Sequence, residues 1–205
     1  MVRLRVVLRG VSPLIVRTLE VPGSATLDVL HEALLVCFDW SGECLHEFTI
    51  RAAGYSSEWV VDAIDTRGVT IESLALRVGE RFVWCYDFAA GWLVDLRVEA
   101  ITVDGGPALV RCVSGKRAGP PEWCGGPAAF YEWEDSHSVI EFLDCIDEIR
   151  DGVDAYGGPV ELEWLEDRLR ALARWAARDR FGKADVNRRL KALEVTSCVS
   201  LFKSG

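Results

Sequence analysis

Apolar and polar side chains alternate along the beginning of the chain. Residues 4–8 and 15–21 both follow this two-residue period, which is typical of β-strands that bury one face and expose the other. Between them lie Gly10, Ser12 and Pro13, residue types that favour turns. The pattern predicts that the chain starts with a β-hairpin.

A helical period follows the hairpin. Thr26 can cap a helix because its side-chain oxygen can accept a hydrogen bond from the first helical turn. The apolar face of this helix is formed by Leu27, Leu30, Leu34 and Cys37. Residues 45–50 and 59–64 return to strand character. An order of strand, strand, helix and strand predicts an α+β fold with the helix packed on the hairpin.

A second hairpin is predicted later in the chain. Residues 81–88 and 92–103 have strand character and flank a short connection. The following residues, 104–127, are rich in glycine and proline, which interrupt helices and strands. We therefore expect a long loop here, and residues 112–127 are its most distinctive part.

The last third of the chain has the pattern of helices. Ser138 and Glu141 form a capping box, Pro159 can open a second helix, and residues 184–193 predict a third. The expected fold is therefore α+β, with an antiparallel, β-grasp-like sheet, a packed N-terminal helix and a C-terminal helical region. We expect an α+β core over residues 1–135, and helices within residues 136–205 that dock on the same core.

Composition and charge narrow the possible partners and the compartment. Half of the 205 residues are hydrophobic, enough for one sizeable core, and no apolar run approaches the roughly 20 residues of a membrane-spanning helix. The seven cysteines include no C-x-x-C pair, which favours reduced thiols and a cytoplasmic location. The net charge of −9 opposes general binding to nucleic acid. No cofactor is predicted.

The candidate metal ligands have poor spacing. His31, His46 and His137 form no H-x-x-x-H pair, and Cys112 and Cys124 are eleven residues apart in the loop. Structural zinc ligands usually come in closer pairs. We predict no metal, with Cys112 and Cys124 as weak candidates only.

Two further groups of residues could carry chemistry. Lys116 and Arg117 resemble part of a phosphate-binding loop, but the full G-x-x-x-x-G-K-[ST] frame is missing, so they either meet an anion or lie on a solvated loop tip. Asp87 could pair with Arg17, and Glu122 follows two stiff prolines. These two carboxylates either do acid–base work or accept hydrogen bonds from nearby backbone amides.

Several motifs spread along the chain resemble the plasmid pRiA-type open-reading-frame-three-like family, whose members are also labelled insertion-element passengers and TnpR-like. The most specific motif is the loop G-x-R-A-x-P-P-E-x-x-G-G, present here at residues 115–126. The others are residues 10–17, Leu30-His31, Trp40, residues 45–48, Tyr86-Asp87-Phe88 with Trp92, and residues 181–190. The resemblance implies an α+β fold with a β-grasp-like sheet and an uncharacterised role linked to plasmids or mobile elements.

The chain departs from the usual family pattern at one turn. The family's Y-D-F-G-D-x-W-x-H is replaced here by residues 86–94, which lack the second acidic residue and the histidine. The chain therefore reads as a divergent member that has lost any site needing those two groups.

We derive three functional hypotheses. The leading one is a non-enzymatic interaction module that binds another protein, with the aromatic residues Trp84, Trp92 and Trp123 at its contact surface. Its binding residues are expected to be Arg17, Trp92, Lys116, Arg117, Pro120, Pro121, Trp123, Gly125 and Gly126. The second is a hydrolase-type enzyme using His46, Asp87 and Glu122. The third is a nucleic-acid-associated accessory protein.

Overall fold

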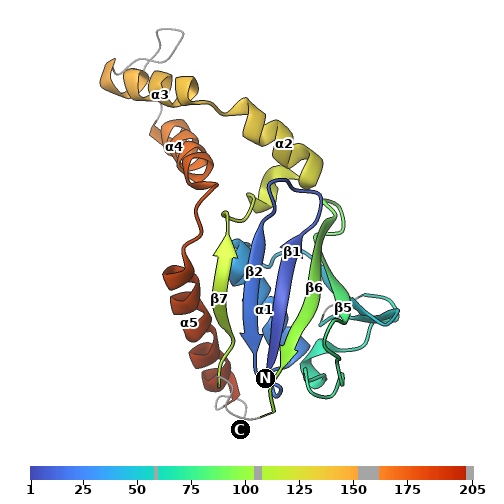
Figure 1. Ribbon diagram of the computed structural model, residues 1–205. Coiled ribbons are helices and arrows are strands. Elements are labelled where there is room, and N and C mark those ends of the chain that lie inside the picture. The colour runs from blue at the N-terminus through green and yellow to red at the C-terminus, as the bar shows by residue number, and fades with distance from the viewer. Residues whose placement is uncertain (58–59, 104–107, 152–161, 202–205) are drawn as a thin grey trace.

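The protein is built on one antiparallel β-sheet. The computed structural model describes residues 1–57, 60–103, 108–151 and 162–201. Seven strands pair in the order β4-β3-β5-β6-β1-β2-β7 (Figure 1). They are β1 (Val2–Leu8), β2 (Val16–Val21), β3 (His46–Ile50), β4 (Ala53–Tyr55), β5 (Arg81–Tyr86), β6 (Trp92–Ile101) and β7 (Arg111–Lys116).

The described residues also form five α-helices. They are α1 (Leu27–Phe38), α2 (Pro127–Ser136), α3 (Val139–Asp151), α4 (Leu162–Ala177) and α5 (Lys183–Leu201). Two short 3₁₀ helices cover Thr66–Gly68 and Glu122–Cys124. None of the helices in the described part of the chain is long and apolar enough to cross a membrane.

Helix α1 packs across one face of the sheet (Figure 1). The side chain of Thr26 accepts a hydrogen bond from the Val29 backbone N–H, and Asp39 ends the helix in a left-handed conformation. Leu30 and Leu34 belong to the same buried core as Leu4 and Val6 of β1. The alternation in β1 therefore directs Val2, Leu4, Val6 and Leu8 toward α1, and its arginines toward the opposite face.

The edge strand β7 is closed by α5. The Asn187 side chain donates to the Cys112 carbonyl and accepts from the Cys112 N–H, both at 2.8 Å. It thus satisfies the strand's backbone groups as a neighbouring strand would, which protects the edge from pairing with another chain. Figure 1 shows α5 running beside β7.

Helices α3 and α4 contact each other away from the sheet. Cys145 and Leu172 form a small buried cluster with Phe142 packed against it. The predicted cap of α3 is present, because the Glu141 backbone N–H donates to the Ser138 hydroxyl at 3.1 Å.

The α+β class is confirmed, but three details differ from the sequence prediction and a fourth is not tested. Residues 104–127 are not wholly irregular, because residues 111–116 form β7 and Pro127 begins α2. Residues 60–64 contain no described strand, only an isolated bridge from Ile64 to Tyr55. Helix α5 is longer than the predicted segment 184–193. The proposed helix start at Pro159 lies outside the described residues.

Candidate functional site

The second face of the sheet has no described helix over its central strands (Figure 1). Along β1, Leu4 and Val6 are buried whereas Arg3 and Arg5 are partly or fully exposed. The same alternation in the neighbouring strands brings polar side chains onto this open face. Antiparallel sheets commonly leave one face in water, so the arrangement of charges on the face decides whether it has a role.

Five hydrogen-bond donors form a line across this open face. Arg5 of β1 lies opposite Arg97 of β6, and Arg97 lies opposite Arg81 of β5. On the other side of Arg5, the line continues through Thr18 of β2 to Ser114 of β7. We call these five residues the arginine line. All three arginines are exposed, and none has an ion-pair partner among the residues that the structure describes.

Two carboxylates near the arginine line are paired with other arginines. Glu20 binds Arg3 and Arg111, each at 2.6 Å, and the hydrogen bond from Arg3 is the main cause that lowers the pKa of Glu20. Asp95 accepts two hydrogen bonds from Arg9, at 2.8 and 2.5 Å. Glu20 and Asp95 are thus occupied by other arginines, whereas Glu99, two residues beyond Arg97 on β6, is exposed and forms no ion pair with another described residue.

Like charges placed directly opposite each other destabilise a sheet. Arg97 has such a neighbour on both sides, Arg5 and Arg81. An anion bound over the three guanidinium groups would remove this repulsion. The arginine line is therefore the strongest candidate for a binding site on the open face.

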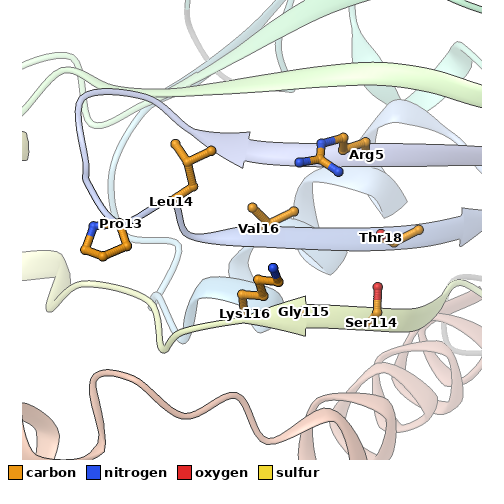
Figure 2. A pocket seen from close by; sticks show the side chains of 8 residues that line it. All are labelled: Arg5, Pro13, Leu14, Val16, Thr18, Ser114, Gly115 and Lys116. Carbon is orange, nitrogen blue, oxygen red and sulfur yellow. The ribbon is translucent and has the colours of Figure 1, made fainter.

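A pocket of about 390 Å³ lies at one end of the arginine line. Figure 2 shows its side chains rising from β1, β2, β7 and the turn between β1 and β2. Its polar lining includes Arg5, Lys116 and the hydroxyls of Thr18 and Ser114; Pro13, Leu14 and Val16 supply the apolar lining, and Gly115 completes it. The pocket therefore offers cations and hydrogen-bond donors beside an apolar wall.

The Arg17 side chain forms hydrogen bonds with the backbone of two residues that line the pocket, Val16 and Lys116. Its guanidinium donates to the carbonyls of Cys37, Val16 and Lys116 at 2.8–2.9 Å. The side chain is 1% exposed, and burial lowers the pKa of Arg17 to about 10. Arg17 was predicted to bind a partner; the structure instead places it where it fixes the position of Lys116.

Phe181 covers the Arg17 guanidinium. The ring centroid lies 4.1 Å from the Arg17 Cζ atom. A Cβ at Gly115 would lie 2.5 Å from the Phe181 ring, so the absence of a side chain at Gly115 makes this packing possible. The loop motif thus contributes a glycine to the architecture of β7.

Arg117 also positions the pocket. It is largely buried, forms ion pairs with Glu134 at 2.6 Å and Asp179 at 3.1 Å, and donates to the Pro13 carbonyl at 2.9 Å. Of the two cations predicted in the loop, Lys116 is exposed and Arg117 is not. Lys116 is the one available to a ligand.

Most of the other residues that were predicted to contact a partner are buried in the core. Trp84 and Trp92 are 0% exposed, which leaves them no surface for a partner. Pro120, Pro121 and Gly126 are buried as well, and the Pro120 carbonyl accepts a hydrogen bond from the Trp40 indole at 3.0 Å. Trp123 and Gly125 are exposed.

The predicted acid–base residues make separate contacts. Glu122 accepts from the Tyr86 hydroxyl and from the Ser41 backbone N–H, the latter at 2.6 Å. Burial, followed by the bond to Glu122, raises the pKa of Tyr86. The Asp87 carboxylate accepts from the backbone N–H groups of Ala89 and Ala90 at 3.1 and 3.2 Å. Both carboxylates thus hold backbone segments in place.

His46, the third predicted acid–base residue, is buried in the core. Its ring stacks on His31 with the centroids 3.5 Å apart. Burial lowers the pKa of His46 to about 4, and burial together with His46 lowers the pKa of His31 to about 3. Both rings are neutral at physiological pH, and no hydrogen bond in the described structure joins His46 to Glu122 or Asp87. A shared catalytic role for the three stays a prediction.

The two loop cysteines have different neighbours. Cys112 is buried, and a hydrogen bond from Cys37 is the main cause that lowers its pKa. Cys124 is partly exposed and lies near the Gly126 carbonyl. Within residues 1–57, 60–103, 108–151 and 162–201, no three His, Cys, Asp or Glu side chains are grouped closely enough to hold a metal ion.

Comparisons with known proteins show the family of the chain and a solved structure with the same fold. A family model described as plasmid pRiA4b ORF-3-like protein matches residues 1–141. The uncharacterized protein y4hQ of Sinorhizobium fredii (strain NBRC 101917 / NGR234) is 34% identical over 140 residues, which cover 64% of this chain and 70% of that protein. The crystal structure of MM3350, a protein of unknown function from Methanosarcina mazei Go1, has a TM-score of 0.65 at 23% identity, covering 90% of this chain and 96% of that one. The last similarity shows the fold alone.

Proposed function

The chain belongs to the plasmid pRiA4b ORF-3-like family, and we propose that it is a non-enzymatic binding module whose open sheet face holds an acidic segment of another protein. The arginine line carries this proposal. Its three guanidinium groups repel one another and have no carboxylate partner among the described residues. An acidic partner would supply the missing charges.

The length of the line favours an extended partner. The five residues occupy five adjacent strands, and strands lie about 4.8 Å apart, so the line is about 19 Å long. A single small anion would reach only one end. A segment carrying several negative charges matches the whole line.

A second row on this face, formed by three valines and Asp95, favours a polypeptide over a nucleic acid. Val7 lies opposite Val16, and Asp95 lies opposite both Val7 and Val83. Within each strand these residues lie two positions from the arginine line, so they form the next row on the same face. A partner with acidic and apolar side chains fits both rows. The described strands present no aromatic side chain on this face for base stacking, and the net charge of −9 opposes long nucleic acids.

The proposal is tested with an amidated nonapeptide that repeats the triplet Glu-Glu-Leu three times. Fluorescence anisotropy should detect its binding to the full-length protein in 50 mM salt, and 1 M salt should weaken it because screening shortens the Debye length to about 3 Å. The Arg5→Gln/Arg97→Gln variant should bind about 2- to 30-fold more weakly, as expected for two exposed charge pairs.

Three controls make the result specific. The Arg180→Gln variant removes an exposed arginine from the connection between α4 and α5 and should bind like the parent. The peptide with glutamine in place of glutamate should not bind. Tighter binding of a single-stranded oligonucleotide of similar charge, or equal binding by both protein variants, would refute the proposal.

The family description names a plasmid. We therefore also propose that the module serves a plasmid or mobile element, which co-purification from cells carrying the native gene cluster would test by identifying a partner encoded on the same element.

A further inference from the structure

The pocket at the end of the arginine line differs from the rest of the face. Along the line itself, cations and valines occupy separate rows, but inside the pocket both kinds of group surround one space of about 390 Å³. The Arg5 guanidinium, the Lys116 ammonium and two hydroxyls line it together with Leu14 and Val16. A group that fills it must be anionic on one side and apolar on the other.

The apolar wall is open to a ligand. Leu14 is 53% exposed although it is a large hydrophobic residue. It sits in the turn between β1 and β2, beside the strands that supply the polar groups (Figure 2). Burying an exposed leucine side chain against another apolar group is favourable, so a partner that covers Leu14 gains affinity.

The pocket is also rigidly built. Arg17 fixes the Lys116 carbonyl at 2.9 Å, and Arg117 fixes the Pro13 carbonyl at 2.9 Å. Both arginines are buried, and neither is among the residues that line the pocket. Their positions keep the two rims of the pocket, β7 and the turn, at a set separation before anything binds, which reduces the cost of binding.

We infer that this pocket receives the carboxyl-terminal residue of the acidic partner, with its terminal carboxylate against Arg5 and Lys116 and an apolar side chain against Leu14 and Val16. This inference rests on the proposed function. A C-terminal residue carries a carboxylate and a side chain on the same Cα, which is the combination that the pocket offers to bind. An internal glutamate lacks the apolar group, and an internal leucine lacks the charge. Capture of a terminal carboxylate is an established mode of peptide recognition.

The rest of the partner can then follow the arginine line. Arg97 and Arg81 lie one and two strands beyond Arg5, at about 5 and 10 Å. An extended peptide advances about 3.3 Å per residue, so acidic residues within the four positions before the C-terminus would meet Arg97 and Arg81. The partner class is thus a protein that ends in a short acidic stretch followed by an apolar residue.

The test compares the Glu-Glu-Leu nonapeptide with a free carboxyl terminus and the same peptide with an amide. The free form should bind at least about tenfold more tightly, as expected for a charge-assisted contact in a lined pocket. A free peptide that ends in serine instead of leucine should lose most of this advantage.

Variants locate the effect in the pocket. Lys116→Gln and Leu14→Asn should each reduce the preference for the free terminus, whereas Lys191→Gln and Leu45→Asn, which change exposed residues elsewhere, should not. Circular dichroism confirms that each variant is folded.

The outcomes separate this inference from the proposed function. Equal affinity for the acid and the amide would overturn the inference while leaving binding along the arginine line intact. N-acetyl-leucine competing as strongly as the whole peptide would also overturn it, because the pocket would then serve a small ligand. Failure of the amidated peptide to bind would count against the proposed function itself.

Discussion

The repulsion along the arginine line makes a prediction about stability. Replacing Arg97 with glutamine removes the central charge of the three and keeps a long polar side chain. Arg97 faces Arg5 and Arg81 on its two neighbouring strands, and each like-charge pair costs about 0.2–1 kcal/mol. The variant should therefore be more stable than the parent by about 0.4–2 kcal/mol in low salt.

This gain is measurable by thermal unfolding. For a chain of this size 1 kcal/mol corresponds to about 2–4 °C, so the melting temperature should rise by about 1–8 °C in 10 mM salt. In 1 M salt the gain should shrink, because the Debye length falls to about 3 Å. The charge-preserving variant Arg97→Lys should show no gain.

The same substitution, Arg97→Gln, should raise the stability of the protein and lower its affinity for the acidic peptide. If Arg97→Gln stabilises the protein and weakens the acidic peptide, the line stores repulsion that a ligand relieves. A destabilised Arg97→Gln variant, or a gain that is the same in 10 mM and 1 M salt, would refute the reasoning, because the arginine would then contribute through packing rather than charge.

Three other features of the structure give predictions. In the unfolded chain His31 and His46 become protonated below about pH 6.5, whereas burial holds their pKa values in the folded protein at about 3 and about 4. The free energy of unfolding should therefore be highest above pH 6.5 and fall as the pH drops toward 4. In urea titrations His31→Leu should remove about 2 kcal/mol of the loss of stability between pH 7 and 5, and an unchanged pH dependence would contradict this. Gly115→Ala should lower the free energy of unfolding by about 1–3 kcal/mol, because the added Cβ would displace Phe181. The control Gly68→Ala, where a Cβ meets no atom within 4 Å, should lower it by less than about 1 kcal/mol. Equal effects of the two variants in denaturant titrations would count against the packing argument. Glu122→Gln should cost about 1–3 kcal/mol by weakening the bonds from Tyr86 and Ser41, and the exposed Glu132→Gln should be neutral by the same measurement.

The local elements could be predicted because their signals are local. The alternation of apolar and polar residues predicted β1 and β2, Thr26 and Ser138 predicted the starts of α1 and α3, and the strand pattern of the second hairpin predicted β5 and β6. Strand β7 was missed because glycine and proline surround it. Its stability depends on distant partners, namely the β2 register and the Asn187 side chain, which no local window contains.

The arginine line was missed for a similar reason. Arg5, Arg81 and Arg97 each occupy an ordinary polar position in a strand, and only the pairing of β1 with β6, far apart in the sequence, aligns them. Conversely, Trp92 and Arg17 suggested a binding surface by residue type, but the sheet buries both. The family loop proved informative about architecture: Gly115, Arg117 and Pro120 hold β7, the turn and Trp40 in place.

The central claim concerns the guanidinium groups of the arginine line, and NMR of arginine side-chain Nε–H signals observes them directly. On titration with the free-acid Glu-Glu-Leu nonapeptide, the signals of Arg5, Arg81 and Arg97 should shift together and saturate with one affinity, while that of Arg180 stays in place. Shifts confined to other arginines, or no shift at peptide concentrations that saturate the anisotropy signal, would contradict the account.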